Sequence, residues 1–218
     1  MKNTEKIILW GVKGSPYVQK VMIALAEKNL SYEHRQVLPK SLLMLRKEPI
    51  PSEFERLSPL GKIPVLQIDD WGIADSSVIT AFLDREFSSD KKLYPDNSKE
   101  YAKALWFERY ADTTLTEVAY KKILFQNIIK PALLNQPTDQ AIVEKAVSVE
   151  LPPMLTYLDH TVGQNEWLAD QRFSMADTAI VVQLIALKKA GVSIDAWKHL
   201  TKYVERVTQQ PSFSSILN

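Results

Sequence analysis

The stretch that decides the fold is Ser15-Pro16-Tyr17-Val18, together with the residues on either side of it. The short apolar run Ile7-Ile8-Leu9-Trp10 precedes it, and apolar residues recur at helical spacing after it. This order predicts a strand, a glycine-containing turn and the start of a helix. Ser15 suits the N-cap and Pro16 the first helical position. Backbone N–H groups and the helix dipole beside the Ser15 hydroxyl would stabilise an anion there.

A helix start of this kind is where thiol enzymes of the thioredoxin type place their cysteine, because the helix end lowers the pKa of a thiol. This chain contains no cysteine, and Ser15 and Val18 stand at the two positions where glutaredoxins have one. Sulfur chemistry at this place must therefore use a sulfur atom that the ligand supplies. The simpler interpretation, a serine–proline pair that only caps a surface helix, stays open until the rest of the chain is considered.

Composition narrows the possible functions of this 218-residue chain. Hydrophobic residues make up 45%, charged residues 24%, and the net charge is +1, so nothing favours binding to nucleic acid or to acidic membranes. No apolar run reaches the roughly 20 residues that span a bilayer, and the polar start Met1–Lys6 is unlike a signal peptide. Without cysteine, and with three scattered histidines, we expect no metal site and a cytoplasmic protein.

Residues 1–87 alternate between strand and helix patterns. After the helix that follows Ser15, residues 31–37 are expected to form a strand parallel to the first one. Residues 38–60 read as a connection with short helices, and Val65–Ile68 forms a strand that returns through a turn to residues 72–74. Asp75 and Ser76 then offer N-cap oxygens to another helix. The predicted order is β-α-β-α-β-β-α, an α/β domain.

The second half of the chain shows mostly helical patterns. Residues 88–97 read as a linker, and residues 98–218 as an all-helical domain. Helices are expected near residues 98–129, 138–160, 175–190 and 195–209. We expect Pro131 and Pro137 to separate the first two, and Pro152-Pro153 to kink the second or to begin a new helix.

Four separated motifs together resemble the cytosolic glutathione transferase superfamily, over essentially the whole chain. Ser15-Pro16-Tyr17 is similar to the Ser-Pro-Phe of the tau class and in register with the Cys-Pro-Phe of the omega class, which suggests a bacterial-type member related to them. Lys62-Ile63-Pro64-Val65-Leu66 is similar to the family's glutathione-binding loop. Asp75-Ser76 is placed like its acidic–serine pair. Ser174-Met175-Ala176-Asp177 is similar to the capping box of its second domain.

The resemblance implies a thioredoxin-like glutathione-binding domain, with glutathione as co-substrate and no metal. Ser15 would be the catalytic residue, its hydroxyl donating a hydrogen bond to the glutathione sulfur, with Tyr17 as the alternative donor. Ile63 and a cis Pro64 would pair with the tripeptide backbone, while Asp75 and Ser76 would hold the γ-glutamyl end. Lys62 is a candidate for the glycyl carboxylate. Lys40 is a second lysine for that carboxylate, but residues 38–60 look longer than is usual for the family, so we do not align it.

The resemblance also implies that the helical domain helps to bind a small hydrophobic electrophile, and that the chain forms a homodimer. Trp10, Trp106 and Tyr110 are the candidate contacts for the electrophile. Further aromatic residues of the second half that could supply such a surface are Tyr101, Phe107, Tyr120 and Trp197. Helical spacing alone does not decide which of them face a binding site and which belong to a core.

Three functions fit these residues, and isomerisation or dehalogenation on the same scaffold stays open beside them. The leading one is transfer of glutathione to an electrophile. A thiol–disulfide oxidoreductase or a peroxidase is the second, and it would need two glutathione molecules to supply both sulfur atoms. The third is a binding protein without catalysis, which predicts poor retention of glutathione. The intact Asp75-Ser76 and Lys62-Ile63-Pro64 motifs argue against this third function.

Overall fold

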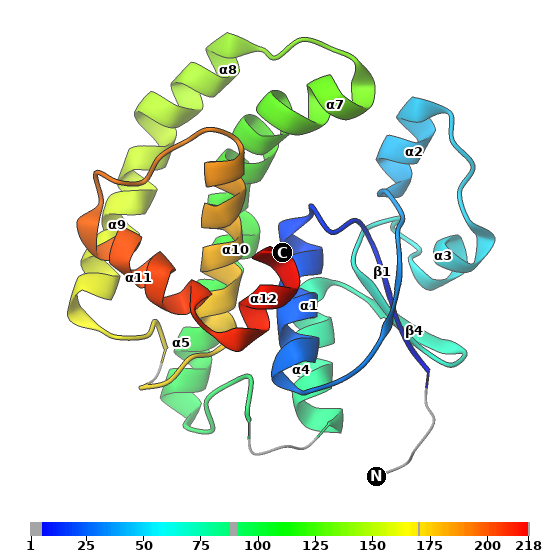
Figure 1. The fold of residues 1–218 in the computed structure, drawn as a ribbon, viewed down its shortest axis with the longest axis horizontal. Helices are drawn as coiled ribbons and strands as arrows, with labels where there is room; N and C mark the ends of the chain where they lie inside the picture. The colour runs from blue at the N-terminus through cyan, green and yellow to red at the C-terminus, as the bar shows by residue number, and fades with distance from the viewer. Residues whose placement is uncertain (1–5, 88–90, 170, 218) are drawn as a thin grey trace. The chain divides into compact units, whose positions relative to one another are not determined.

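The computed structural model describes residues 6–87, 91–169 and 171–217. The chain divides into two compact units, one of residues 1–93 with 212–218 and the other of residues 94–211. Figure 1 shows the ribbon of both. The C-terminal segment, which the sequence pattern placed in the helical domain, thus groups with the first unit. Part of the expected linker, residues 88–90, lies outside the described residues.

The first unit is built on a four-stranded sheet in the order β2-β1-β3-β4. The strands are β1 (Ile7–Trp10), β2 (Glu33–Arg35), β3 (Val65–Ile68) and β4 (Trp71–Ala74). β1 pairs with β2 in parallel and with β3 antiparallel, and β3 pairs antiparallel with β4. The parallel pair and the hairpin confirm the sequence prediction, although β2 is shorter than the expected 31–37.

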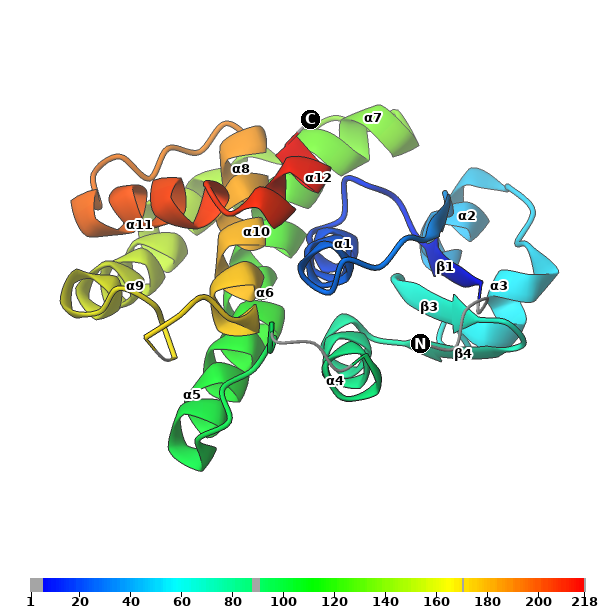
Figure 2. The ribbon, with the colours of Figure 1, turned by 60° about the horizontal axis from the view of Figure 1, so that its bottom comes forward.

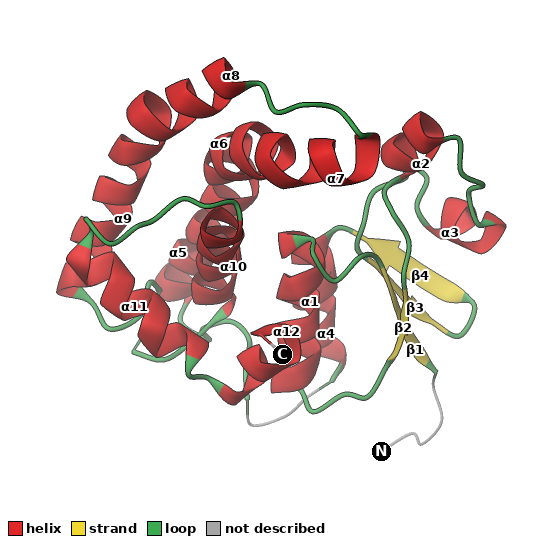
Figure 3. Cartoon of the chain, turned by 45° about the horizontal axis from the view of Figure 1, so that its top comes forward, coloured by secondary structure: helices red, strands yellow, loops and turns green. Residues whose placement is uncertain are grey.

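Helices cover both faces of this sheet (Figures 2 and 3). α1 (Pro16–Glu27) and α4 (Ser76–Glu86) lie together on one face, and α2 (Lys40–Arg46) and α3 (Ser52–Leu57) lie on the other. Because side chains alternate along a strand, β1 serves both layers. Its Ile8 and Trp10 join the core of the α2–α3 face, which also contains Val37, Leu43, Phe54, Leu57 and Val65. A last short helix, α12 (Ser214–Leu217), packs against α1.

The strand register brings three chain turns to one edge of the sheet. Trp10, the last residue of β1, lies opposite Val65, the first of β3. Val65 in turn lies opposite Ala74, the last residue of β4. The segments just beyond these residues, 11–15, 61–64 and 75–76, therefore meet at the same edge.

The described residues of the second unit form helices joined by loops and include no strand. Its central helix, α10 (Met175–Lys189), is buried along nearly its whole length. The other segments, with wider π-type turns marked η, are α5 (Ser98–Arg109), η1 (Tyr110–Leu115), α6 (Thr116–Val118), η2 (Ala119–Ile129), α7 (Lys130–Leu134), α8 (Gln140–Lys145), η3 (Ala146–Glu150), α9 (Leu151–Gln164) and α11 (Lys198–Thr208). A 3₁₀ turn, η4 (Pro211–Phe213), follows at the unit boundary.

The prolines of the second unit match the expected helix breaks in part: Pro137 lies in the break between α7 and α8, as predicted, but Pro131 does not interrupt the helix. Pro131 does not stop the first long helix: it stands in the first turn of α7, which follows the π-type turn η2 without a break, and α7 continues to Leu134. Pro152-Pro153 begins α9 directly after the π-type turn η3, which is the second of the two alternatives. The prediction of a break at Pro131 was therefore wrong.

The start of α10 confirms the predicted capping box. The Asp177 carboxylate accepts hydrogen bonds from the Ser174 N–H at 2.9 Å, the Leu168 N–H at 2.9 Å and the Tyr203 hydroxyl at 2.6 Å. Asp177 is fully buried, and burial raises the pKa of its carboxyl group. Its role is to satisfy backbone donors at a buried helix end.

Candidate functional site

The turn after β1 carries Ser15, the residue for which a catalytic role was predicted. Ser15 is 4% exposed and occupies the N-cap position of α1, followed by Pro16. Its carbonyl accepts the first helical hydrogen bond, from the Gln19 N–H at 2.9 Å, but its side chain makes no capping bond. The hydroxyl is thus not committed to the helix backbone, unlike that of an ordinary serine cap.

Tight packing fixes the Ser15 turn against the neighbouring loop. Gly11 has φ +140°, and a Cβ atom there would lie 2.5 Å from Val18 Cγ2 and 3.3 Å from Ile63 Cβ. The Gln19 side chain donates to the Lys13 carbonyl at 2.9 Å, and His34 Nε2 is 2.8 Å from the Gly11 carbonyl oxygen. Only glycine allows this close approach of the turn to the 61–64 loop.

The 61–64 loop contains a cis peptide bond between Ile63 and Pro64, as predicted. The Ser58 hydroxyl donates to the Lys62 carbonyl at 2.8 Å, which holds the loop from α3. Pro64 precedes the first residue of β3, where its missing N–H removes no ladder bond. Ile63 is half-buried and lies beside Gly11 at this edge of the sheet.

Asp75 and Ser76 form the third element at this edge. Asp75 has φ +81°, and its carboxylate accepts from the N–H groups of Ser77 at 3.0 Å and Val78 at 3.2 Å. The predicted N-cap is therefore confirmed. Because Asp75 caps those two donors, Ser76 is the first helical residue that can turn its own N–H and hydroxyl towards an anion.

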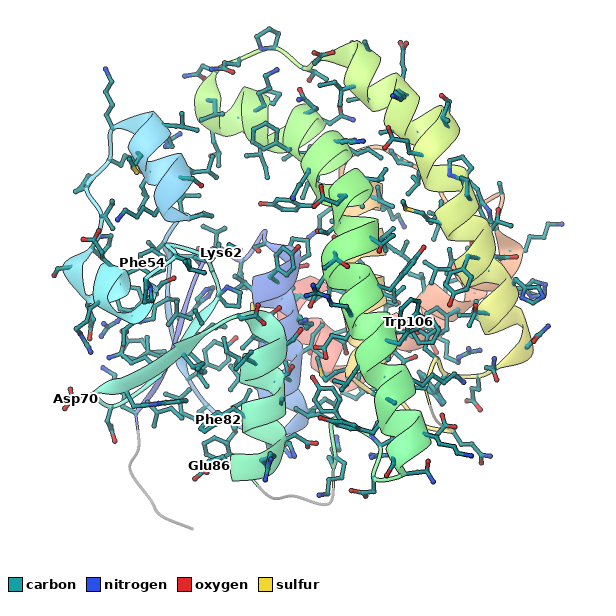
Figure 4. The ribbon with its side chains drawn as sticks, turned by 180° about the vertical axis from the view of Figure 1, so that it is seen from behind. Phe54, Lys62, Asp70, Phe82, Glu86 and Trp106 are labelled. Carbon is teal, nitrogen blue, oxygen red and sulfur yellow. The ribbon has the colours of Figure 1, made fainter. Side chains whose placement is uncertain are left out.

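Two lysines stand near the 61–64 loop. Lys62 is exposed, and Figure 4 shows it near Phe54 of α3. Lys40, at the start of α2, donates its backbone N–H to the Gly61 carbonyl at 2.8 Å, and its Nζ is 2.5 Å from the Glu55 carboxylate. Fold geometry thus places Lys40 beside the loop, which the sequence could not show because the length of residues 38–60 obscured the alignment.

Comparison with known proteins gives a consistent result. Family models described as the N-terminal and C-terminal domains of glutathione S-transferase match residues 9–91 and 122–211. Glutathione S-transferase F6 of Arabidopsis thaliana is 27% identical over 213 residues, which are 97% of this chain and 99% of the relative. The crystal structure of glutathione transferase F7 from Populus trichocarpa has a TM-score of 0.81 at 25% identity, over 96% of this chain and 97% of that one. The chain belongs to the glutathione S-transferase superfamily.

A further solved glutathione S-transferase, glutathione S-transferase-I, is bound with the ligand lactoylglutathione. It has a TM-score of 0.80 at 24% identity, over 97% of this chain and 98% of that one. These relatives cover both units, so the predicted fold class, a thioredoxin-like α/β domain followed by a glutathione-transferase helical domain, is confirmed.

Trp10, one of the three candidate contacts for the electrophile, lies inside the α2–α3 core. Its indole Nε1–H donates to the Gln67 side chain at 2.8 Å, and its ring is 6.3 Å from that of Phe54. The Arg35 guanidinium stacks 4.9 Å from the ring centroid. This hydrogen-bonded indole is 6% exposed, so it supports the sheet core and presents little surface to a ligand.

A partly exposed charged network lies next to this core and reaches it through Gln67. The Gln67 amide donates to Glu53 at 2.8 Å, and Arg35 pairs with the other carboxylate oxygen at 2.6 Å. The hydrogen bond from Gln67, followed by the charge of Arg35, lowers the pKa of Glu53. The network orders α3 against the sheet, next to the loop that carries Lys62.

The other two candidates, Trp106 and Tyr110, belong to the second unit, where the structure brings them together through Tyr157 of α9. Trp106 Nε1 is 3.4 Å from the Tyr157 hydroxyl, and the Tyr110 and Tyr157 rings are 5.5 Å apart. Burial, and then the neighbouring Tyr157, raise the pKa of Tyr110 to about 12. Tyr157 was missed because its position on α9 carries no motif.

The remaining aromatic residues of the helical unit have separate environments. Phe107 is 2% exposed and belongs to the core, so it offers no surface. The Trp197 indole N–H donates to the Thr156 hydroxyl at 3.0 Å, and the ring centroids of Tyr101 and Tyr94 are 5.8 Å apart. Tyr120 is half-buried, which raises its pKa.

The described residues contain neither a metal-binding cluster nor a membrane-spanning helix. No group of three His, Asp or Glu side chains in that part of the chain could hold a metal ion. Nor does any described helix combine the length and apolar character that a membrane crossing requires.

Proposed function

We propose that this glutathione transferase binds glutathione at the edge of its sheet, stabilises the thiolate, and transfers it to a small hydrophobic electrophile. The observation that carries the proposal is the convergence of three segments at that edge, residues 11–15, the cis Ile63–Pro64 loop and Asp75-Ser76. The donor set suits an extended tripeptide with a carboxylate at each end and a thiol between them.

Each segment would hold one part of glutathione. Ser76, at the start of α4, binds the γ-glutamyl carboxylate, and Asp75 fixes that helix end and faces the γ-glutamyl amino group. The backbone of Ile63, turned by the cis bond to Pro64, pairs with the cysteinyl residue in β fashion. Lys62, with Lys40 beside it, neutralises the glycyl carboxylate.

The Ser15 hydroxyl would donate a hydrogen bond to the sulfur, and the N-terminus of α1 would add a favourable field. Both lower the pKa of the thiol, because they stabilise its ionised form. The thiolate then attacks the electrophilic carbon: a C–S bond forms, and the leaving group departs with its electron pair. Ser15 stabilises the nucleophile and forms no covalent bond itself. Tyr17, the second residue of α1, is the alternative donor.

For the electrophile we propose the exposed ring of Trp106 and the half-buried ring of Tyr110 as aromatic contacts. Apolar, flat molecules such as aryl halides pack favourably on surfaces of this kind. The homodimer expected from the family is also proposed here.

Retention on immobilised glutathione, with elution by free glutathione, tests the proposal. The wild-type protein should be retained, and the variant Ser76→Ala should elute early because it lacks the γ-glutamyl contact. Ser31→Ala, which replaces an exposed serine in the loop between α1 and β2, is the matched control and should behave as the wild type. Failure of the wild type to be retained would contradict the proposal and favour a binding protein without catalysis.

Turnover assays then separate the chemistries. We expect glutathione-dependent consumption of an aryl halide, at a rate well above that of the buffer reaction. Activity restricted to mixed disulfides or to peroxides would contradict transfer and would indicate an oxidoreductase or a peroxidase.

A further inference from the structure

A fully buried lysine links the two helices that begin at the sheet edge. Lys20, in the second turn of α1, has no exposed surface, and its Nζ donates to the Ser77 hydroxyl of α4 at 2.9 Å. Ser77 follows Ser76 directly, and Lys20 lies four residues after Pro16. The ammonium group is thus one residue from the proposed γ-glutamyl contact and one helical turn from the start of α1.

α1 and α4 run side by side in the same direction (Figures 1 and 2). Their starts are joined by Lys20 and Ser77, and their ends by the ion pair of Lys28 and Asp84, with Nζ 2.7 Å from the carboxylate. The Lys28 side chain is also fully buried. The helix pair therefore carries two buried lysines, one at the end that faces the sheet edge and one at the opposite end.

A positive charge on Lys20 would act strongly on a nearby anion. Charges interact more strongly where protein atoms replace water around them. An ammonium group beside the start of α4 adds to the positive end of the helix dipole, which favours an anion at Ser76. The hydrogen bond to Ser77 also fixes the distance between α1, which carries Ser15, and α4, which carries Ser76.

We propose that Lys20 is a positioning residue for the γ-glutamyl carboxylate of glutathione. It holds the start of α4 against α1 through Ser77 and adds a fixed positive charge behind the carboxylate. The proposal rests on the proposed glutathione site, and it assigns to α1 a second role besides the placement of Ser15.

Glutathione binding to Lys20→Met tests this role, with Lys28→Met as the matched control for loss of a buried lysine from the same helix pair. The second ligand is a glutathione analogue in which a 4-aminobutanoyl group replaces the γ-glutamyl group and so lacks its α-carboxylate. Dissociation constants are measured by calorimetry for both ligands, and thermal unfolding shows that each variant is folded.

Lys20→Met should weaken glutathione binding about tenfold, the effect of losing one charge-assisted interaction. It should bind the analogue as the wild type does, because the carboxylate that the charge serves is absent. Lys28→Met should keep the wild-type affinity for glutathione, and Lys20→Arg should recover part of the lost affinity. A rise in KM for glutathione with kcat unchanged is expected in turnover assays.

Equal affinity of Lys20→Met and wild type for glutathione, or equal weakening for both ligands, would overturn the inference. If Lys20→Met does not fold, the Ser77→Ala variant is used in its place. Ser77→Ala keeps Lys20 and removes the hydroxyl that accepts its hydrogen bond. This variant should weaken glutathione binding and leave the analogue unaffected, and no change would overturn the inference. A wild-type protein that binds no glutathione would instead refute the proposed function itself.

Discussion

Ser15 stands at the first turn of α1 with a hydroxyl that makes no capping bond, and this distinguishes it from an ordinary helix cap. Close packing and one side-chain hydrogen bond hold the turn that carries Ser15 in place. Gly11 approaches Val18 and Ile63, and Gln19 holds the Lys13 carbonyl. At the scale of single residues, therefore, the candidate site depends on the rigidity of one turn as much as on one hydroxyl.

Replacing Gly11 by alanine should disturb this turn strongly. The new Cβ would meet Val18 Cγ2 at 2.5 Å, and φ +140° is unfavourable for any residue but glycine. We expect a loss of about 2 kcal/mol or more in the free energy of unfolding, measured by urea denaturation. Gly14→Ala is the control, because a Cβ there meets nothing within 4 Å. A Gly11→Ala protein as stable as Gly14→Ala would contradict the tight packing of the turn.

Tyr110 should make stability depend on alkaline pH. Burial raises the pKa of its phenol from about 10 in the unfolded chain to about 12 in the folded state. Because the pKa is raised, the stability that the neutral Tyr110 phenol contributes to the folded state is fully present below about pH 10. This stability is lost as the pH rises through about 12. Spectrophotometric titration of wild type against Tyr110→Phe should show one phenol that ionises near pH 12. A difference spectrum that appears near pH 10 would contradict this environment.

The sequence located the residues that have local patterns, and missed those whose role depends on tertiary contacts. Ser15, Pro64 and Asp75 each follow or precede a recognisable strand or helix end, so their positions were predictable. Trp10 was expected to contact the electrophile, but its side chain belongs to the core and donates to Gln67. The side chains of β1 alternate between two buried faces, and the sequence does not show which face Trp10 occupies. Lys20 was not considered, because a lysine within a helix pattern reads as a solvated residue.

Helix ends decide the stability of individual elements. In α10 the buried Asp177 accepts backbone and side-chain donors, whereas in α8 the exposed Asp139 accepts a single N–H, from Ile142 at 3.3 Å. The same residue type thus caps two helices in very different environments. Helix breaks are harder to predict than helix caps. Pro131 looks like a stop signal in the sequence, but α7 follows the π-type turn η2 directly and runs through it to Leu134.

Asp177→Ala and Asp139→Ala separate these two environments. The first should lower the free energy of unfolding by about 3 kcal/mol, because it leaves buried N–H groups without acceptors. The second should cost about 1 kcal/mol, the usual effect of losing an exposed cap. Both values come from chemical denaturation followed by circular dichroism. Equal losses for the two variants would contradict the central role of the buried cap.

At the scale of the whole molecule, the two units follow the family's order of a thioredoxin-like domain and a helical domain. The composition predicted a globular chain, and the motifs predicted this order. The attachment of residues 212–218 to the first unit was not predictable, because a short C-terminal helix has no pattern that names its partner.

We expect a homodimer in solution. Large apolar side chains remain exposed within each unit, among them Trp71 and Val78 in the first and Leu105 and Val149 in the second, and a second copy would cover such residues. Sedimentation equilibrium should give about twice the chain mass of 24.9 kDa. A mass equal to that of one chain at micromolar concentration would refute the dimer.

The ionisation state of bound glutathione is the decisive measurement for the proposed role of Ser15. Free thiols have a pKa near about 8.5, so at about pH 7 unbound glutathione is mostly protonated. Wild-type protein saturated with glutathione at this pH should show the ultraviolet absorbance of a thiolate. Ser15→Ala should bind glutathione with similar affinity and lack that absorbance. A thiolate signal of equal size in both proteins, or none in the wild type, would contradict the account.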